Sequence, residues 1–178
     1  GIHIGYERVR RLMRLASIKP IYPRRHLTQW KKNEYIYPYL LRNLAITEKN
    51  QVWEIDITYI PMAKGFMYLT AIIDVYSRYI VGWGLSNSLD ADSSLRVVKD
   101  AIRDHGKPSI LNSDQGSQFT CREYVEYLKD QHIQISMDGK GRALDNIYIE
   151  RFWRTIKYQH IYLNPAESGI DLFIGIKK

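Results

Sequence analysis

The chain has 178 residues, of which 45% are hydrophobic and 25% charged, a composition ordinary for one globular domain with its own core. No apolar run approaches the roughly 20 residues of a membrane-spanning helix, and no secretory signal is visible, so we expect a cytoplasmic protein. The single cysteine, Cys121, excludes an internal disulfide and a cysteine-rich zinc site. Because the sequence starts at Gly1 rather than Met and stops at Lys178 in what resembles a helix, we interpret it as a fragment.

The positive charge is concentrated at one end of the chain. The net charge is +7. Residues 1–52 contain 11 Lys and Arg against 3 Asp and Glu, whereas residues 53–178 contain 15 against 16. This asymmetry is typical of an arm that touches nucleic-acid phosphates, although a solvated basic face without a partner would have the same charge.

The basic segment divides into a helix and a linker. Helical spacing of apolar residues predicts a helix over Tyr6–Ala16. Three prolines within Ile18–Asn50 predict an extended linker, with a short helix near Tyr39–Leu44. Cations and aromatics in this linker favour contact with DNA, and a packed linker is equally consistent with them. The cations that we expect to contact DNA are Arg24, Arg25, Lys31 and Lys32.

The remaining sequence predicts strands and helices in the order β-β-β-α-β-α-β-α. A meander of three strands followed by alternating helices and strands predicts an α/β fold, a mixed sheet flanked by helices, and this order is found in ribonuclease H-like folds. The predicted strands are Val52–Ile60, Phe66–Asp74, Tyr79–Leu85, Ser109–Asn112 and Ile133–Met137. The predicted helices are Ala91–His105, capped by Asp90, a helix from a Thr120/Glu123 capping box through Lys129, and Asn146–Tyr158.

Three carboxylates occupy positions where an acid is informative. Asp56 lies in the middle of the first predicted strand, Asp114 directly follows the fourth, and Glu150 lies on the last helix. Taken singly, each has a simpler explanation: an exposed strand face, a loop aspartate or an acid on an amphipathic helix. Glu54 shares the strand face of Asp56 and is expected to pair with an arginine, whereas Asp74 is interpreted as a turn residue at the end of a strand.

Taken together, the three carboxylates indicate a metal site. A strand, the loop after a strand and a helix can converge on one point, and sites in α/β sheets form at the carboxyl ends of strands. Two hard cations about 4 Å apart need several oxygen ligands and support phosphodiester chemistry. We therefore expect Asp56, Asp114 and Glu150 to approach one another within roughly 4–8 Å. Helical spacing places Arg154 and Lys157 on the same helix face as Glu150, where phosphates would lie.

At these residues the sequence resembles the integrase core of DDE transposases from bacterial insertion sequences, the branch similar to retroviral integrases. The similarity extends from about Gln51 to the end of the chain, and 35 residues separate Asp114 from Glu150, as in this family. The segments that carry the resemblance are Trp53–Tyr59, Asp74–Arg78, Ser113–Phe119, Asp145–Asn146 and Glu150–Trp153 with Lys157.

The resemblance implies a transposase subunit, translated from a second reading frame, that cuts and joins DNA. Asp56, Asp114 and Glu150 would bind two Mg²⁺ or Mn²⁺ ions, and Arg154 and Lys157 would hold the DNA of the element's end. Residues 1–18 would end a helix-turn-helix region, 19–50 form the basic linker, and 51–178 form the catalytic core. Assembly of a homo-oligomer on DNA at the nucleoid is expected. The supporting residues would be Thr58, Tyr59, Gln115, Gly116 and Asn146.

Two alternatives remain open. A ribonuclease H-like nuclease would share the metal chemistry but use only water as its nucleophile. A catalytically inactive DNA-binding remnant would keep the fold without the reaction. The presence of all three carboxylates disfavours the remnant, and the long basic linker disfavours the simple nuclease.

Overall fold

The computed structural model describes residues 5–16, 35–139 and 146–177, and it divides into two compact units, residues 1–31 and 32–178. In the first unit, α1 (Tyr6–Leu15) confirms the predicted helix, and it buries none of its own residues. The four predicted DNA-binding cations of the linker, at positions 24, 25, 31 and 32, lie outside the described residues. None of the helices within the described ranges combines the length and hydropathy needed to traverse a lipid bilayer.

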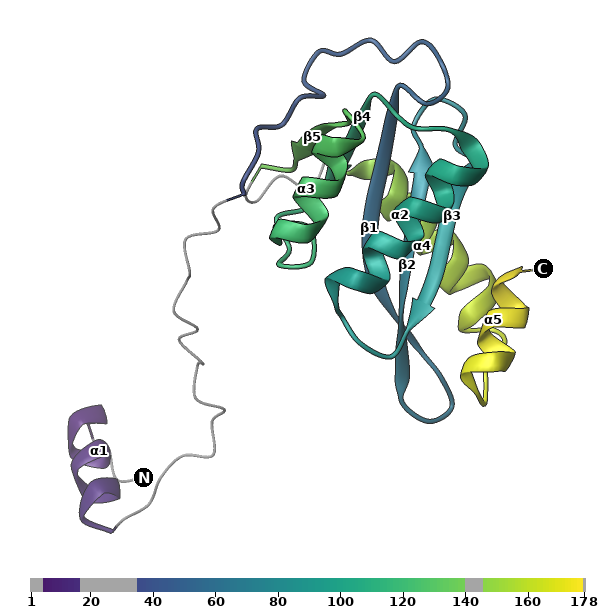
Figure 1. The fold of residues 1–178 in the computed structure, drawn as a ribbon. Coiled ribbons are helices and arrows are strands. Elements are labelled where there is room, and N and C mark those ends of the chain that lie inside the picture. Colours follow the sequence, from purple (N-terminus) through teal and green to yellow (C-terminus); the bar gives the residue numbers. More distant parts are fainter. Residues whose placement is uncertain (1–4, 17–34, 140–145, 178) are drawn as a thin grey trace. The chain divides into compact units, whose positions relative to one another are not determined.

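The second unit is built on a five-stranded sheet of order β3-β2-β1-β4-β5 (Figure 1). The first three strands form an antiparallel meander, and β4 and β5 run parallel to β1. This arrangement confirms the mixed sheet and the order of elements expected from the sequence. The strands are β1 (Val52–Pro61), β2 (Phe66–Asp74), β3 (Ile80–Ser86), β4 (Ile110–Ser113) and β5 (Gln134–Met137).

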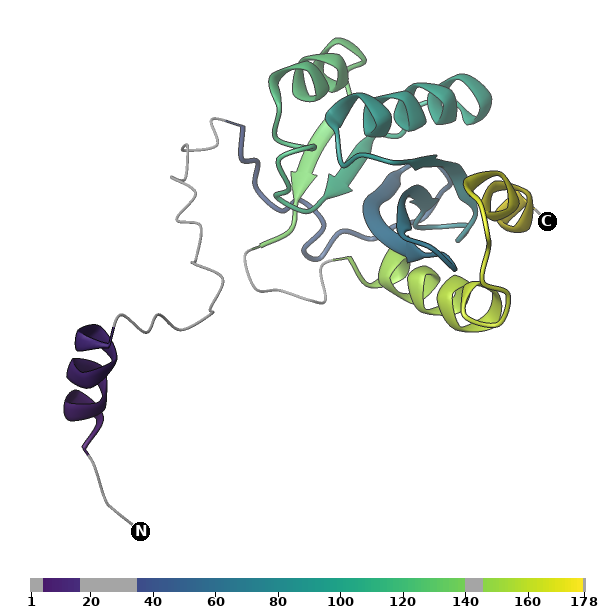
Figure 2. The ribbon, with the colours of Figure 1, turned by 90° about the horizontal axis from the view of Figure 1, so that it is seen from below.

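Helices cover both faces of this sheet (Figure 2). On one face, Trp53 and Ile55 of β1 belong to a core cluster shared with α2 (Ala91–His105) and α3 (Arg122–Asp130). On the other face, Ile60 packs in a cluster with residues of α4 (Ile147–Ile156). Because side chains alternate along a strand, the even-numbered residues of β1, including Asp56, face α4.

Residues 35–50, the second half of the predicted linker, pack against the sheet. The backbone N–H of Leu40 donates to the Ser136 hydroxyl at 3.0 Å, which ties the linker to β5. The short helix predicted near Tyr39–Leu44 was wrong: the segment is irregular and turns at Asn43, which has a φ of 62°. Asparagine tolerates this left-handed conformation, which would end a helix.

The capping box predicted for α3 was also wrong. The helix begins at Arg122 with Cys121 as its N-cap, and no side chain caps it. The Thr120 hydroxyl instead donates to the carbonyl of Gly116 at 3.0 Å. Thr120 therefore stabilises the preceding loop rather than the helix.

The chain after α4 differs most from expectation. The predicted helix to Tyr158 ends at Ile156 and widens into a π-helical turn, η1 (Lys157–Ile161). A further helix, α5 (Gly169–Lys177), agrees with the helical interpretation of the end of the chain, although the predicted order of elements did not include it. It packs through Phe173, whose ring centroid lies 5.2 Å from that of Trp83 in β3.

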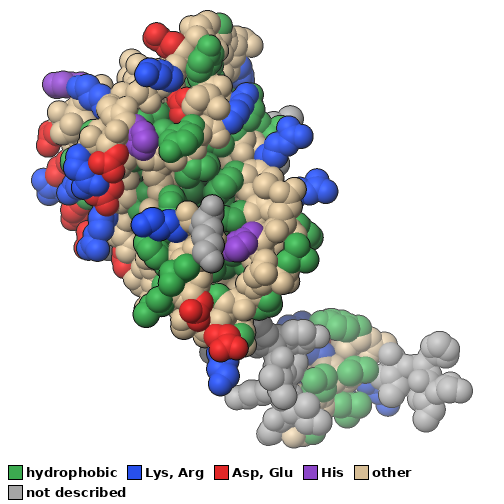
Figure 3. Space-filling view, turned by 90° about the vertical axis from the view of Figure 1, so that its right-hand side faces the viewer, with side chains coloured by type: hydrophobic (Ala, Val, Ile, Leu, Met, Phe, Trp, Pro, Cys, Tyr) green, Lys and Arg blue, Asp and Glu red, His purple; other side chains and the backbone are tan. Residues whose placement is uncertain are grey.

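Helix α5 and its neighbours leave apolar side chains at the surface. Hydrophobic side chains gather in the middle of the face shown in Figure 3, with charged side chains around them. On α5 itself Ile170, Phe173 and Ile174 are exposed. Uniform hydrophobicity around α5 explains why its sequence shows no helical periodicity.

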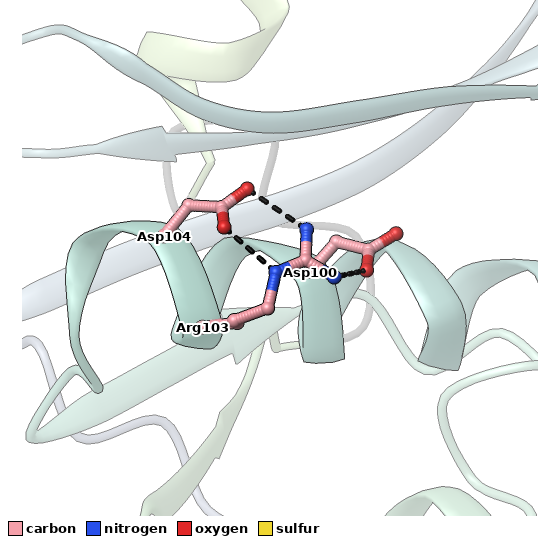
Figure 4. Close-up of polar contacts among 3 residues, drawn as sticks. All are labelled: Asp100, Arg103 and Asp104. Atoms are coloured by element: carbon pink, nitrogen blue, oxygen red, sulfur yellow. Dashed lines mark hydrogen bonds and ion pairs between the residues drawn. The ribbon is translucent and has the colours of Figure 1, made fainter.

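Helix α2 shows the charge pattern expected of a surface helix. The Asp90 carboxylate accepts a hydrogen bond from the Ser93 N–H at 2.7 Å, which confirms the predicted N-cap. Near its other end, Arg103 binds both Asp100 and Asp104 (Figure 4). These pairs are exposed, so we expect them to contribute little to stability.

Close packing of α2 on the sheet depends on glycine in β3. A Cβ atom at Gly82 would lie 2.9 Å from the Cβ of Ala101 and 3.3 Å from the carbonyl of Val97. We predict that Gly82→Ala lowers the free energy of unfolding by about 1–3 kcal/mol, measured by urea denaturation, because the helix must move outward. Gly5→Ala, with no atom within 4 Å of the added Cβ, is the control and should leave the unfolding of the core unchanged.

Candidate active site between the sheet and helix α4

The register of β1 and β4 brings two of the three predicted carboxylates together. These strands are parallel neighbours, and Glu54 lies level with Asn112. Strand β4 ends at Ser113 and Asp114 follows it directly, so a continuation of this register would bring Asp114 level with Asp56. The negative charge of Asp114 accordingly contributes to raising the pKa of Asp56.

The loop that holds Asp114 is fixed by its own backbone. The Asp114 carboxylate accepts a hydrogen bond from the N–H of Gly116 at 2.9 Å. A Cβ at Gly116 would lie 2.8 Å from that carboxylate and 2.3 Å from the Gln118 amide nitrogen. Glycine is needed here for space, not for the positive φ that a sharp turn would require. The Gln115 side chain donates to the carbonyl of Asp138 at 2.9 Å, which anchors the loop to the end of β5.

Helix α4, which carries the third predicted carboxylate, touches Asp56 through another of its residues. The indole N–H of Trp153 donates to the Asp56 carboxylate at 2.8 Å, and Glu150 lies one turn earlier on the helix with its side chain exposed. One turn later, the Lys157 ammonium donates to the Thr58 hydroxyl at 2.6 Å. That ammonium also lies 5.2 Å from the centre of the Tyr59 ring.

Strand β1 makes three hydrogen bonds in a row, two to helix α4 and one to Lys157, the first residue of η1. The pairs are Glu54 with the Ile149 N–H, Asp56 with Trp153, and Thr58 with Lys157, and we call them the β1–α4 contact row. Two residues along a strand span about 6.7 Å and four residues along a helix about 6.0 Å. These nearly equal steps allow every second residue of β1 to meet every fourth residue of α4.

The electrostatics at Asp56 indicate a crowded group of negative charges. Burial is the main cause of the raised pKa of Asp56, and the charges of Asp114 and Glu150 raise it further. Hydrogen bonds from the Trp153 indole and the Ile57 backbone oppose this shift. The charges of Asp114 and Glu150 both act on Asp56, an arrangement that a bound cation would stabilise.

Lys157 is a cation whose pKa is affected by the charge of Asp56, although its hydrogen bond is to Thr58. Partial burial lowers its pKa, and the charge of Asp56 opposes that shift. Within residues 35–139 and 146–177, none of Asp56, Asp114 and Glu150 forms an ion pair. In the same ranges no three His, Cys, Asp or Glu side chains form a closed group that could hold a metal ion. The ligand set therefore remains a prediction.

The other predicted residues take varied positions. Asn146 is the N-cap residue of α4, but its side chain makes no capping hydrogen bond. Arg154 is exposed on α4, one turn beyond Glu150. Asp145, which could have capped the helix, lies outside the described residues.

Glu54 differs from its expected role. In place of an arginine, its carboxylate accepts the backbone N–H of Ile149 at 3.1 Å, and it is only 2% exposed. Burial raises its pKa to about 7, against the opposing effect of the hydrogen bonds from Ile149 and Tyr148.

Asp74 is a buried turn residue, as expected. Its carboxylate accepts the N–H groups of Asn50 at 3.0 Å and Ser77 at 2.9 Å, together with the Ser77 hydroxyl. The turn that follows carries Arg78 at a φ of 64°, and the guanidinium carbon lies 3.3 Å from the centre of the Tyr148 ring. The start of α4 is thus contacted from this turn as well as from β1.

Sequence reasoning missed two contacts at the site. The hydrogen bond from the Trp153 indole to Asp56 was not foreseen. This contact could have been predicted from the position of Trp153 three residues after Glu150. Residues three apart on a helix lie on the same face, so both side chains can approach one strand residue. The stacking of Arg78 on Tyr148 had no signal in the local sequence, because 70 positions separate the two.

Comparison with known proteins places these residues in a family. Residues 46–143 match the family described as the integrase core domain. The chain belongs to the integrase core family. It is 34% identical to the transposase of insertion sequence element IS904 from Lactococcus lactis, with 97% of this chain and 72% of that protein covered. It is 32% identical to the transposase InsF of insertion sequence IS3A from Escherichia coli, with 64% of this chain and 40% of that protein covered.

Solved structures confirm the ribonuclease H-like fold of this integrase core. The HTLV-2 integrase catalytic core domain, determined in complex with magnesium, aligns with a TM-score of 0.53 at 25% identity, covering 61% of this chain and 67% of that chain. A chain of the simian T-cell lymphotropic virus intasome aligns with a TM-score of 0.64 at 18% identity, covering 80% of this chain and 52% of its own length. The absence of the short helix near Tyr39–Leu44 and of the capping box at α3 does not affect this fold assignment.

Stability of this integrase core should depend on the protonation of Glu54. Its pKa is raised from 4.5 in the ordinary case to about 7 in the fold, so the folded state retains a proton that the unfolded state loses. The free energy of unfolding should therefore fall as pH rises from about 4.5 to about 7, by at most about 3 kcal/mol, and then level off. Glu54→Gln should remove this contribution. Parallel denaturation curves for both proteins between pH 5 and 8 would contradict the prediction.

The loop of Asp114 should not accept a side chain at Gly116. We predict that Gly116→Ala lowers the free energy of unfolding by about 1–3 kcal/mol, because the added methyl group crowds the Asp114 carboxylate. Ser117→Ala, in the same loop at an exposed position, is the matched control. Equal denaturation midpoints for the two variants would show that the loop can relax around the methyl group.

Proposed function

We propose that the chain is the catalytic core of a metal-dependent transposase that cuts DNA at the ends of an insertion sequence and joins those ends to target DNA. The observation that supports the proposal is the placement of Asp56 against α4, where the charges of Asp114 and Glu150 raise its pKa and the Lys157 ammonium binds the neighbouring Thr58. Family membership and the names of the transposase relatives support the same reaction.

Two divalent cations, Mg²⁺ or Mn²⁺, are part of the proposal, with Asp56, Asp114 and Glu150 as their ligands. The donors fit, because all three offer carboxylate oxygens, the preferred ligands of hard cations. The raised pKa of Asp56 also fits, since nearby like charges favour a compensating cation. When bound, such ions stabilise the attacking and leaving oxygens of a phosphodiester displacement.

The protein's own residues orient the reacting groups. Trp153 holds one oxygen of Asp56 through its indole N–H, which fixes the rotation of that carboxylate. Thr58 holds Lys157 near the acids, where its ammonium can bind a phosphate of the element's end. Arg154, exposed on α4, would bind a neighbouring phosphate, and Gly116 keeps the Asp114 loop in shape.

The reaction itself needs no covalent intermediate with the protein. In the joining step, a 3′-hydroxyl oxygen of the element forms a bond to a target phosphorus, and the bond from that phosphorus to the target's 3′ oxygen breaks. The proton of the attacking hydroxyl passes to solvent, and the leaving oxygen takes up a proton. One phosphodiester replaces another, so no energy source is required.

The proposal also includes the partners and the location of the protein. DNA is the substrate, and a homo-oligomer would bring two ends together in the bacterial cytoplasm, where the element's DNA lies. The similarity to a chain from an intasome agrees with assembly on DNA. The chain spans 72% of the IS904 transposase and 40% of InsF, so recognition of specific end sequences is assigned to the whole protein.

A branched DNA that mimics a joining product tests the reaction. We predict that the protein with Mn²⁺ or Mg²⁺ rejoins the labelled strand, and that Glu150→Gln reduces the rate by at least about 100-fold because a ligand is lost. The products are separated on a denaturing gel.

Glu123→Gln is the matched control, because Glu123 is an exposed glutamate on α3, outside the site. It should rejoin DNA at the rate of the unchanged protein. Cleavage without rejoining would support the simple nuclease. Absence of any reaction, combined with no Mn²⁺ binding by titration, would support the inactive DNA-binding remnant.

A further inference from the structure

Helix α4, which carries Glu150, begins without a cap of its own. The first N–H groups of a helix have no partner within the helix and need an acceptor from elsewhere. The N-cap residue, Asn146, makes no side-chain hydrogen bond to them. Its buried side-chain oxygen has no hydrogen-bond partner among the described residues.

The missing acceptor comes from the strand that carries Asp56. The Glu54 carboxylate accepts the N–H of Ile149 at 3.1 Å, across 95 residues of sequence. A hydrogen bond from the Tyr148 backbone also stabilises the charged form of Glu54. A carboxylate at this position matches both the unsatisfied N–H groups and the positive end of the helix dipole.

We propose that Glu54 is the positioning residue of this active site: it caps α4 from β1 and thereby sets where Glu150 stands relative to Asp56. The inference rests on the proposed function, because it concerns the geometry of the same three carboxylates. Glu54 itself touches neither DNA nor a cation in this role.

The short path between the residues explains how one hydrogen bond can have this effect. Glu54 and Asp56 are two residues apart on the same face of one strand, and Ile149 and Glu150 are adjacent on one helix. The cap therefore joins two regular elements directly. Ile149 is fully buried, so its N–H is placed by packing as well as by the hydrogen bond.

The burial of Glu54 supports a specific role over simple packing. Its carboxylate is desolvated, because the side chain is only 2% exposed. An apolar side chain would fill the same space without this desolvation cost. The compensation available to a carboxylate here is the hydrogen bonding at the start of α4.

Contacts near the same turn keep Glu54 from being an isolated buried charge. The Arg78 guanidinium stacks on the Tyr148 ring in the first turn of α4. Its positive charge lowers the pKa of Glu54, whereas the charge of Asp138 raises it. Arg78 fixes the side chain of Tyr148, and Glu54 fixes the backbone behind it.

Two variants of the full chain separate capping from packing. Glu54→Gln keeps an oxygen acceptor, whereas Glu54→Val removes it and leaves an apolar group. We predict that Glu54→Val lowers kcat for strand rejoining by about 10- to 100-fold, the effect of displacing a reacting group by a fraction of an ångström to 1 Å. KM for the branched DNA should stay within about twofold, and Glu54→Gln should restore kcat to within about threefold of the unchanged protein.

Hydrogen exchange gives a readout that does not depend on activity. Glu54→Val should accelerate amide exchange at residues 147–150, and Glu54→Gln should not. Val98→Ala is the control for general loss of stability, since Val98 is a fully buried residue of α2 away from the site. It should lower the melting temperature without the local change in exchange and without the loss of kcat at a temperature where it is folded.

Each outcome bears on the proposal. Unchanged exchange at residues 147–150 in Glu54→Val would show that Glu54 does not cap α4. Faster exchange with unchanged kcat would show that the cap does not position Glu150, and a Glu54→Gln protein as slow as Glu54→Val would show that the acceptor is not what matters. If the unchanged protein neither cuts nor rejoins DNA, the proposed function fails, and the exchange result still decides whether the cap exists.

Discussion

The arrangement of the site depends on the contact row between β1 and α4. Three side chains on one face of a strand meet three positions at successive turns of a helix, and each meeting is a hydrogen bond. The helix would otherwise be held mainly by its apolar face against Ile60 and its neighbours, and apolar contacts do not select one position along a strand. Directional bonds supply that selection, so the exposed Glu150 acquires a defined place beside Asp56.

The turn after β2 contributes to the same arrangement from a different direction. The buried carboxylate of Asp74 orders the turn by accepting two backbone N–H groups and the Ser77 hydroxyl. The turn ends at Arg78 in a left-handed conformation, which costs free energy for a residue other than glycine. The guanidinium thereby reaches Tyr148 on α4. The segment Asp74–Arg78 is one of those that resemble the family. The contact of Arg78 with Tyr148 gives this segment a structural role.

Much of the fold could be predicted from the sequence because its periodicities are local. Alternation along β1 and β2 and the helical spacing in α2 each depend on neighbouring residues, and Asp90 caps α2 as expected. The π-helical turn could not be predicted, because it departs from any regular period, and the bounds of α5 could not be predicted because its mostly apolar sequence has no clear helical period. The convergence of Asp56, Asp114 and Glu150 was expected from strand, loop and helix placement, and it stays a prediction. The partner of Glu54 was not foreseen, because a backbone N–H 95 residues away leaves no mark in the sequence.

The number of hydrogen bonds in the β1–α4 contact row is limited. Two residues of a strand advance about 0.7 Å more than four residues of a helix. The offset between the strand residues and the helix residues of the row therefore grows with each pair. After three pairs the accumulated offset is about 1.4 Å, half the length of a hydrogen bond. The next pair in the series would be Ile60 with Ile161, two apolar side chains buried in one hydrophobic cluster, so it cannot be a side-chain hydrogen bond. The regular α-helix ends at Ile156, one residue before the last pair, and the chain changes there to a wider turn. One extra residue inserted between Glu150 and Trp153 would rotate the following positions by about 100°, so this stretch should tolerate substitution far better than a change in length.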